Sequence, residues 1–315
     1  MKNVLFNCAE LGAGTRGASL GPDAVYLAAA RKNPSLFARA HVSRLDLHHD
    51  PLLARTPSPR ARYLPEIARW ADALAHQVRH QLQDPEPLRV FSGDHAHAAG
   101  LYSGFWEAHH HQHKGLLWID AHADLHTPYT SPSGNVHGMP IAALLGLTDE
   151  GGARHQPDEA DQKAWKHWLA CGPSRKMGKL LPSELAFVGL RSVEPEEQFL
   201  LDYLRIPYYT SNQVQERGIG AIMDELEAHF QHTEALYVSF DVDVLDPSLS
   251  QGTGTPVPHG LSLHEAAPLL THFGRDPRCR LLEFTEINPL LDTENKMAET
   301  VTTLLEELEH VAVHS

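Results

Sequence analysis

The chain has 315 residues, and its 40 Asp and Glu exceed its 26 Lys and Arg to give a formal net charge of −14 at pH 7. This acidic balance argues against a nucleic-acid partner, because nucleic-acid-binding surfaces are basic. The hydrophobic content of 42% suits a globular protein, no apolar stretch is long enough to span a membrane, and the three widely spaced cysteines suit the reducing cytoplasm.

Short apolar runs typical of strands alternate with helical patterns along the chain. The strand-like runs lie near residues 3–7, 41–47, 88–92, 115–120, 185–190, 205–210, 235–241 and 280–286. Helical patterns cover residues 62–83, 211–230, 262–273, which Ser262 and Glu265 open as a capping box, and 295–313. The alternation predicts an α/β fold with a mostly parallel sheet covered on both faces. We predict one domain over residues 1–315, with 148–182 as an insertion or surface excursion.

Three of the strand-like runs end in clustered aspartate and histidine. Side chains at alternate positions of an extended chain point to one side, and sites in parallel sheets form at the carboxyl ends of strands. The candidate metal ligands at these ends are His95, Asp120, His122, Asp124, Asp241 and Asp243. Taken singly, each aspartate is better explained as a helix cap or a turn residue, but together they predict a metal centre.

The composition of this ligand set indicates which metal it holds. Carboxylates with a minority of imidazoles favour Mn²⁺ or a similar ion. The four aspartates balance the charge of two divalent ions, which predicts two Mn²⁺ per chain sharing a water whose pKa they lower. Asp246, followed by proline, fits a turn better than a ligand, and Asp94 fits a partner that supports the ligands.

A second group of histidines lies outside these strand ends. His109, His110, His111 and His113 continue a helix expected from about Ala96, so their side chains would point to different sides. The tract therefore favours a solvated helix end over a metal cluster.

Several motifs together resemble one family over nearly the whole chain. These are Gly93-Asp94-His95, the Asp120–Asp124 element, Ser133-Gly134-Asn135-Val136-His137-Gly138, Gly189-Leu190-Arg191, Ser239-Phe240-Asp241-Val242-Asp243, Gly252-Thr253-Gly254-Thr255-Pro256 and Glu286-Ile287-Asn288-Pro289. The chain resembles the ureohydrolases, and among them most closely the arginases. The resemblance implies a three-layer α/β/α fold with about eight strands, a binuclear manganese centre, release of urea from a small cationic guanidino substrate, and assembly into trimers or hexamers.

The resemblance also implies roles for individual residues. His95, Asp120, Asp124 and Asp241 would hold one ion, and Asp120, His122, Asp241 and Asp243 the other, so that Asp120 and Asp241 bridge. The catalytic residues would be His137 as a proton shuttle, Glu286 as the guanidinium anchor, and Asp124. Ser133 and Asn135 would bind the amino-acid end of the substrate, and Thr255 would line the site.

The chemistry supports these roles independently. A guanidinium carbon is a poor electrophile, so its hydrolysis needs an activated water, a carboxylate to orient the planar cation, and a proton for the leaving amine. Glu286 and His137 suit the last two tasks, although a surface ion pair and a helix-cap or core histidine are the alternatives.

The chain departs from the arginase pattern where the substrate tail would bind. His126 stands where arginases usually carry asparagine, and Ser192 and Glu194 stand where they usually carry two aspartates. Both His126 and Glu194 can still contact an amino-acid tail, so we expect both to bind substrate.

The leading hypothesis is therefore hydrolysis of L-arginine to L-ornithine and urea. The close alternatives are ureohydrolases that act on agmatine, guanidinobutyrate or formiminoglutamate. A mononuclear zinc deacetylase would not need His95 and all four aspartates, and a non-catalytic metal protein would be expected to have lost ligands, His137 or Glu286.

Overall fold

The computed structural model describes residues 1–46, 49–53, 58–148, 152–249 and 251–309. Within these residues, eight strands form one parallel sheet in the order β2-β1-β3-β8-β7-β4-β5-β6. The strands are β1 (Asn3–Cys8), β2 (His41–Asp46), β3 (Leu88–Ser92), β4 (Lys114–Ile119), β5 (Leu185–Leu190), β6 (Tyr208–Thr210), β7 (Ala235–Asp241) and β8 (Cys279–Thr285). The predicted parallel, eight-stranded sheet is confirmed.

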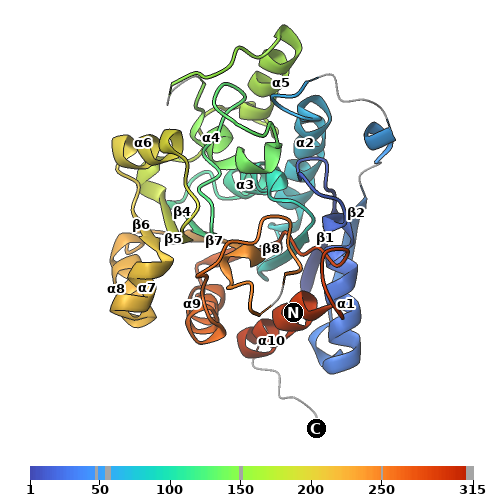
Figure 1. The fold of residues 1–315 in the computed structure, drawn as a ribbon. Coiled ribbons are helices and arrows are strands. Elements are labelled where there is room, and N and C mark those ends of the chain that lie inside the picture. The colour runs from blue at the N-terminus through green and yellow to red at the C-terminus, as the bar shows by residue number, and fades with distance from the viewer. Residues whose placement is uncertain (47–48, 54–57, 149–151, 250, 310–315) are drawn as a thin grey trace.

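Helices cover both faces of this sheet, which makes the three predicted layers (Figure 1). One face carries α2 (Leu64–Gln81), α3 (Ala98–Ala108), α4 (Pro140–Leu145), α5 (Glu159–Leu169) and α6 (Pro195–Leu204). The other carries α1 (Gly21–Lys32), α7 (Ser211–Arg217), α8 (Ile219–His229), α9 (Leu263–Arg275) and α10 (Lys296–Glu309). In the part of the chain that the structure describes, none of these helices is both long and apolar enough to cross a membrane.

The central strands are mostly apolar because both of their faces are buried. In β4, Leu116 and Trp118 belong to the core beneath α2 to α6, whereas Leu117 and Ile119 belong to the core on the opposite face. Alternate side chains of a strand point to opposite faces, so a continuous apolar run fills both cores. The prediction of one domain over the whole chain stays a prediction.

The predicted element boundaries differ from the structure in two places. The 211–230 pattern is two helices, because Gly218 adopts a left-handed φ of 81° between them. The strand expected from residue 205 shortens to β6, because Arg205 caps α6 and the next positions lead through Pro207. The Ser262–Glu265 capping box is confirmed, and residues 310–313 of the expected C-terminal helix lie outside the described residues.

Residues 148–182 were predicted as an insertion or surface excursion, and the residues described there are not a surface excursion. They include α5, whose Trp165 and Trp168 are almost completely buried in the core shared with α2. The Trp165 Nε1 donates to the Leu147 carbonyl at 3.1 Å. The polar residues of this segment lie on the outer face of an amphipathic helix.

Asp72 of α2 contacts both α5 and the residues that follow it. Its carboxylate accepts from the Gly172 N–H at 2.9 Å, from the Arg175 guanidinium at 2.7 Å and from His167 Nε2 at 2.6 Å. Burial raises the pKa of Asp72, but these donors outweigh it and lower the pKa below its ordinary value. We expect Asp72→Asn to reduce the free energy of unfolding by about 1–3 kcal/mol at neutral pH.

The pH dependence of this effect has a defined sign. A carboxylate with a lowered folded-state pKa contributes stability above its unfolded pKa of about 3.9, and this stability is lost as the pH falls through the folded-state value. Denaturant melts of wild type and Asp72→Asn should therefore differ at pH 7 and converge in acid. Asp224→Asn, at an exposed aspartate of α8, serves as the control and should match wild type at both pH values.

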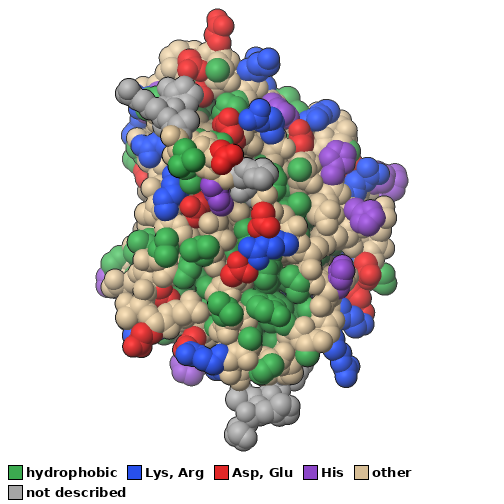
Figure 2. All heavy atoms as spheres, turned by 90° about the vertical axis from the view of Figure 1, so that its right-hand side faces the viewer, with side chains coloured by type: hydrophobic (Ala, Val, Ile, Leu, Met, Phe, Trp, Pro, Cys, Tyr) green, Lys and Arg blue, Asp and Glu red, His purple; other side chains and the backbone are tan. Residues whose placement is uncertain are grey.

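The sheet edge formed by β2 is only partly covered. Figure 2 views the side of α1 and β2, where hydrophobic side chains gather among charged ones. Tyr26 and Leu27 of α1 are 42% and 65% exposed, and Val42 of β2 is 37% exposed. These apolar side chains are available for contact with another protein surface.

Candidate active site

The candidate metal ligands and Glu286 follow four strands that are adjacent in the sheet. β3, β8, β7 and β4 lie side by side at its centre, and their carboxyl ends open on the same edge. His95 follows β3, Glu286 follows β8, Asp241 ends β7, and Asp120 follows β4. Parallel topology thus brings together residues separated by almost 200 positions in the sequence.

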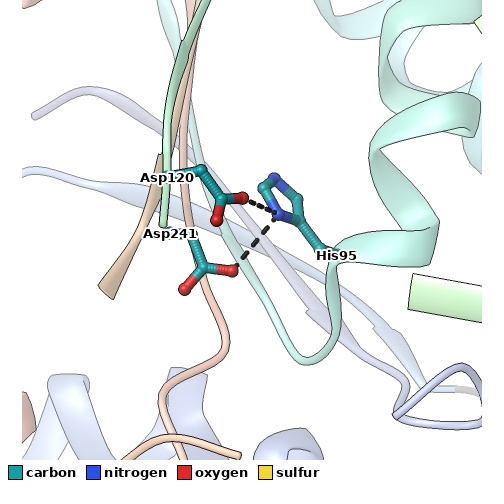
Figure 3. Close-up of side chains that lie close together, drawn as sticks. All are labelled: His95, Asp120 and Asp241. Atoms are coloured by element: carbon teal, nitrogen blue, oxygen red, sulfur yellow. Dashed lines mark ion pairs between the residues drawn. The ribbon is translucent and has the colours of Figure 1, made fainter. Parts of the chain in front are cut away.

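The first group of metal-type ligands surrounds His95. Its Nδ1 lies 3.0 Å from Asp120 Oδ2, 3.2 Å from Asp241 Oδ2 and 3.3 Å from Asp124 Oδ2. Figure 3 shows the Asp120 and Asp241 carboxylates facing the same nitrogen of the His95 ring. The ring also stacks on Trp118 at 3.9 Å between centroids, which fixes its plane. His95, Asp120 and Asp241 can hold one ion.

The second group surrounds His122. Its Nδ1 lies 3.0 Å from Asp243 Oδ2 and 3.5 Å from Asp120 Oδ1, and these three residues can hold another ion. Asp120 thus faces both groups, one oxygen to each. Asp241 belongs only to the first group. The Oδ1 atoms of both aspartates also accept a backbone N–H at 2.7 Å, from His122 for Asp120 and from Asp243 for Asp241.

The raised pKa values of two carboxyl groups in this site favour the binding of cations. Burial, together with repulsion from Asp243 and Asp120, raises the pKa of Asp241 well above its ordinary value. Burial and Asp120 raise the pKa of Asp124 to about 6. Burial and mutual repulsion therefore oppose the charged forms of Asp124 and Asp241, and cations beside them would favour these forms.

The orientation of the ligand atoms agrees with this charge deficit. His95 Nδ1 and Asp120 Oδ2 are both buried and lie 3.0 Å from each other. Neither atom has a hydrogen-bond partner with suitable geometry within the described residues. The two atoms are near enough to share an ion without being directed at each other. The side chains present therefore fit a divalent metal.

Two of the carboxylate residues adopt strained backbone conformations. Asp124 has a φ of 52° and Glu286 a φ of 63°, in the left-handed region that residues other than glycine rarely adopt. Such residues cost of order 1–3 kcal/mol and cluster at functional sites. The strain is consistent with side chains that are aimed at a ligand.

Glu286 is tied to the imidazole expected to move protons. Its Oε1 lies 3.0 Å from His137 Nδ1 and accepts the His95 N–H at 2.9 Å. Burial alone would lower the pKa of His137, but the charge of Glu286 outweighs it and raises the pKa to about 9. Burial likewise opposes ionisation of Glu286, whereas His137 lowers the pKa of this carboxyl.

The residues expected to read the substrate tail lie farther out. His126 Nε2 is 3.3 Å from Glu194 Oε2, so the two departures from the arginase pattern contact each other. Ser133 is exposed, and its Oγ accepts the Asn135 N–H at 3.1 Å. Asn135 Oδ1 in turn accepts from Arg62 at 3.2 Å.

One pocket unites nearly all of these positions. It is lined by His95, His122, Asp124, His126, Ser131, Pro132, Ser133, Asn135, His137, Gly138, Ser192, Glu194, Glu197, Asp241, Asp243 and Thr255. Thr255 donates to Asp243 Oδ2 at 3.0 Å. Asp120 and Glu286 lie buried beside the pocket and reach it through their contacts with His95 and His137.

Three residues that take part in this site were missed from the sequence. Ser239 Oγ lies 2.8 Å from His95 Nε2 and donates to Glu283 Oε2 at 3.0 Å, and Glu283 is fully buried. Glu197 lines the pocket near His126. An acidic residue inside the apolar run of β8 was the available signal for Glu283, because buried carboxylates need a structural or functional reason.

The ambiguous residues of the sequence are now placed. Asp94 is buried and accepts from the backbone of Gly12 and Ala96, so it shapes the turn that carries His95. Asp246 accepts from the backbone of Ser248 and Gly260, as expected of a turn residue.

The histidine tract lies away from this pocket. α3 ends before it, and His110, His111 and His113 are exposed, as expected of a solvated helix end. His109 instead packs its ring against Phe105.

The chain is similar to known proteins along nearly its whole length. The model of the arginase family matches residues 4–310. An arginase of Bacillus caldovelox is 32% identical over 310 residues, covering 95% of this chain and 94% of the relative. A crystal structure of that arginase has a TM-score of 0.80, 29% identity and full coverage of both chains. The formimidoylglutamase of Bacillus subtilis shares the fold, with a TM-score of 0.74, 16% identity and coverage of 98% of this chain and 87% of that one.

Proposed function

The chain belongs to the arginase family of hydrolases, and from this premise we propose that it converts L-arginine and water to L-ornithine and urea. The observation that carries the proposal is the Glu286–His137 pair beside two groups of metal-type ligands in one pocket. A guanidinium ion needs an anchor, a proton donor and a nucleophile, and this arrangement offers a place for each.

We propose that two Mn²⁺ ions complete the site. His95, Asp120, Asp124 and Asp241 would hold one ion, and Asp120, His122 and Asp243 the other. The family resemblance also assigns Asp241 to the second ion, whereas its nearest imidazole contact is with His95. When bound, the pair of ions would supply a water of lowered pKa as the nucleophile.

Glu286 and His137 then act on the substrate itself. Because Glu286 Oε1 already accepts from His95 and His137, we expect its Oε2 to accept hydrogen bonds from the guanidinium. Because His137 Nδ1 faces Glu286, its Nε2 is the atom that delivers a proton to the leaving amine. The Asp124 carboxylate lies beside the His95 imidazole and next to Gly138.

The outer residues support an amino-acid tail. Ser133 and Asn135 offer hydrogen bonds to the tail from the lining of the pocket, and the His126 imidazole and the Glu194 carboxylate line it as well. The alternative is a ureohydrolase with another tail, acting on agmatine, guanidinobutyrate or formiminoglutamate. This alternative remains because Ser192 stands where arginases usually carry a charged aspartate.

The decisive experiment separates these substrates. Mn²⁺-loaded protein is incubated with L-arginine, agmatine, guanidinobutyrate and formiminoglutamate, and urea, ammonia and amine products are quantified. We expect urea from L-arginine at a kcat/KM at least about 100-fold above that for the others, because loss of a paired tail charge costs 2–5 kcal/mol. Turnover of another substrate alone would move the specificity, and no turnover would refute the proposal.

Ser239 gives a test of the support behind the first ion. Removing the hydroxyl in Ser239→Ala frees His95 Nε2 and separates it from Glu283. Loss of such an outer partner typically weakens metal binding about 10- to 100-fold, and we expect the same here. Mn²⁺ titration by calorimetry measures the effect. Ser103→Ala, at a buried serine bound to the Ala99 carbonyl, should retain wild-type affinity.

We also propose a cytoplasmic homo-oligomer, a trimer or hexamer. The exposed Phe199–Tyr203 stack on α6 and the exposed apolar side chains of α1 support an assembly surface. The three cysteines are buried and unpaired, which suits a reducing compartment. Sedimentation equilibrium tests the assembly, and a mass equal to one chain would contradict it.

A further inference from the structure

A third group of potential metal ligands lies at the outer end of the pocket, separate from the two groups around His95 and His122. It consists of His126, Glu194 and Glu197, whose nearest ligand atoms all lie within 4.8 Å of one another. His126 Nε2 is 3.3 Å from Glu194 Oε2 and 3.8 Å from Glu197 Oε2. All three residues line the pocket. Neither predicted manganese ion needs them.

The imidazole of His126 is aimed at this point but has no partner there. The side chain is only 8% exposed, and its Nε2 has no hydrogen-bond partner among the described residues. Its other nitrogen, Nδ1, lies 3.1 Å from Thr130 Oγ1, and that hydroxyl is 3.5 Å from the Thr127 carbonyl to which it can donate. This chain of contacts favours the proton on Nδ1, which leaves the Nε2 lone pair facing two carboxylates.

The carboxylates are also held in place from outside. Glu197 Oε1 accepts the Leu125 N–H at 3.0 Å, and its Oε2 accepts the Glu194 N–H at 3.1 Å. Glu197 is 2% exposed, whereas Glu194 is 43% exposed in its side chain and opens towards solvent. Two acidic oxygens and a lone pair therefore converge on one point, and such a point attracts a cation.

We propose that His126, Glu194 and Glu197 form a third metal site, which takes a zinc-type divalent ion. Zinc bonds to nitrogen and oxygen ligands are about 2.0–2.1 Å, so two ligands of a tetrahedral ion lie about 3.3–3.4 Å apart. The His126–Glu194 separation of 3.3 Å matches this edge, and the Glu197 oxygen at 3.8 Å needs only a small shift. One imidazole with two carboxylates and an open position is a donor set that zinc accepts.

An ion at this site occupies the part of the pocket where the substrate tail is proposed to bind. It removes Glu194 from any contact with an α-ammonium group and adds positive charge there. Zinc is therefore expected to raise the KM for L-arginine while leaving kcat nearly unchanged. This consequence for kinetics rests on the proposed function, whereas the site itself does not.

Metal counting tests the site without any turnover. Mn²⁺-loaded protein is dialysed against Zn²⁺, and both metals are measured together by atomic emission, so that exchange of zinc for manganese does not change the total. We expect a total of about three ions per chain in wild type and about two in His126→Asn. Anomalous scattering at the zinc edge locates the additional ion.

Two further variants make the result decisive. Glu194→Gln alters a half-exposed side chain, so it should fold and also lose one ion. His111→Asn removes an exposed histidine far from the cluster and should keep the wild-type total, which controls for surface binding. An equal count in wild type, His126→Asn and Glu194→Gln would overturn the proposal. If zinc binds but no substrate is hydrolysed, the third site stands and only the proposed function fails.

Discussion

Replacing Glu286 with glutamine is expected to lower kcat/KM for urea release by about 10²- to 10³-fold. Truncating one partner of a buried charged pair costs about 2–5 kcal/mol, and each 1.4 kcal/mol corresponds to a factor of ten. Glutamine keeps the shape of Glu286 but loses the charge that anchors a guanidinium. It also loses the charge that opposes the burial of His137, so the pKa of His137 should fall from about 9.

This second effect gives the loss a direction with pH. An imidazole donates a proton only below its pKa, so the variant should lose more activity at pH 9 than at pH 7. Steady-state kinetics over this range, with an NMR titration of His137 in metal-free protein, measure both effects. Glu306→Gln, at a buried glutamate of α10 that pairs with Lys32 of α1, is the matched control and should retain full activity. An unchanged pKa of His137 would show that Glu286 does not control it.

The inner part of the site was accessible from sequence because local geometry dictates it. Asp120, His122 and Asp124 alternate after a strand, and the period of two places them on one side wherever the strand lies. The parallel sheet then brings the carboxyl ends of β3, β4 and β7 to the same edge. Clusters of ligands at these strand ends are therefore expected to lie close together. The fold could also be predicted from local patterns, since apolar runs and amphipathic helices alternate along the chain.

The outer part was not accessible, because it depends on contacts between loops. The sequence marks His126 and Glu194 as separate departures from a family pattern, whereas the structure joins them at 3.3 Å. Glu197 reads as an ordinary residue in the first turn of α6. Trp165 and Trp168 gave no sign of where they pack, so the residues around α5 were misread as a surface excursion. Distances between loop residues are set by tertiary packing, which no local period records.

Asp120 and Asp241 provide a sharp test of how the two ions are held. Asp120 directs Oδ2 to His95 and Oδ1 to the His122 imidazole, whereas Asp241 lies near the His95 imidazole only. The Oδ1 atoms of both also accept a backbone N–H, so the contact with His122 is what distinguishes Asp120. We therefore expect Asp120→Asn to retain less than about one Mn²⁺ per chain and to slow urea release at least about 10³-fold. Asp241→Asn should retain about one ion, that of the His122 group.

Metal content after dialysis, measured alongside urea release, distinguishes this arrangement from the symmetrical one that the family resemblance implies. If Asp241 bridges as fully as Asp120, both variants lose both ions. Asp246→Asn changes a nearby turn aspartate outside the pocket and should keep two ions. Because all three substitutions are isosteric, a difference among them reports the position of each charge and not the volume of the side chain. The asymmetry between Asp120 and Asp241 then decides which ion can be removed while the other stays bound.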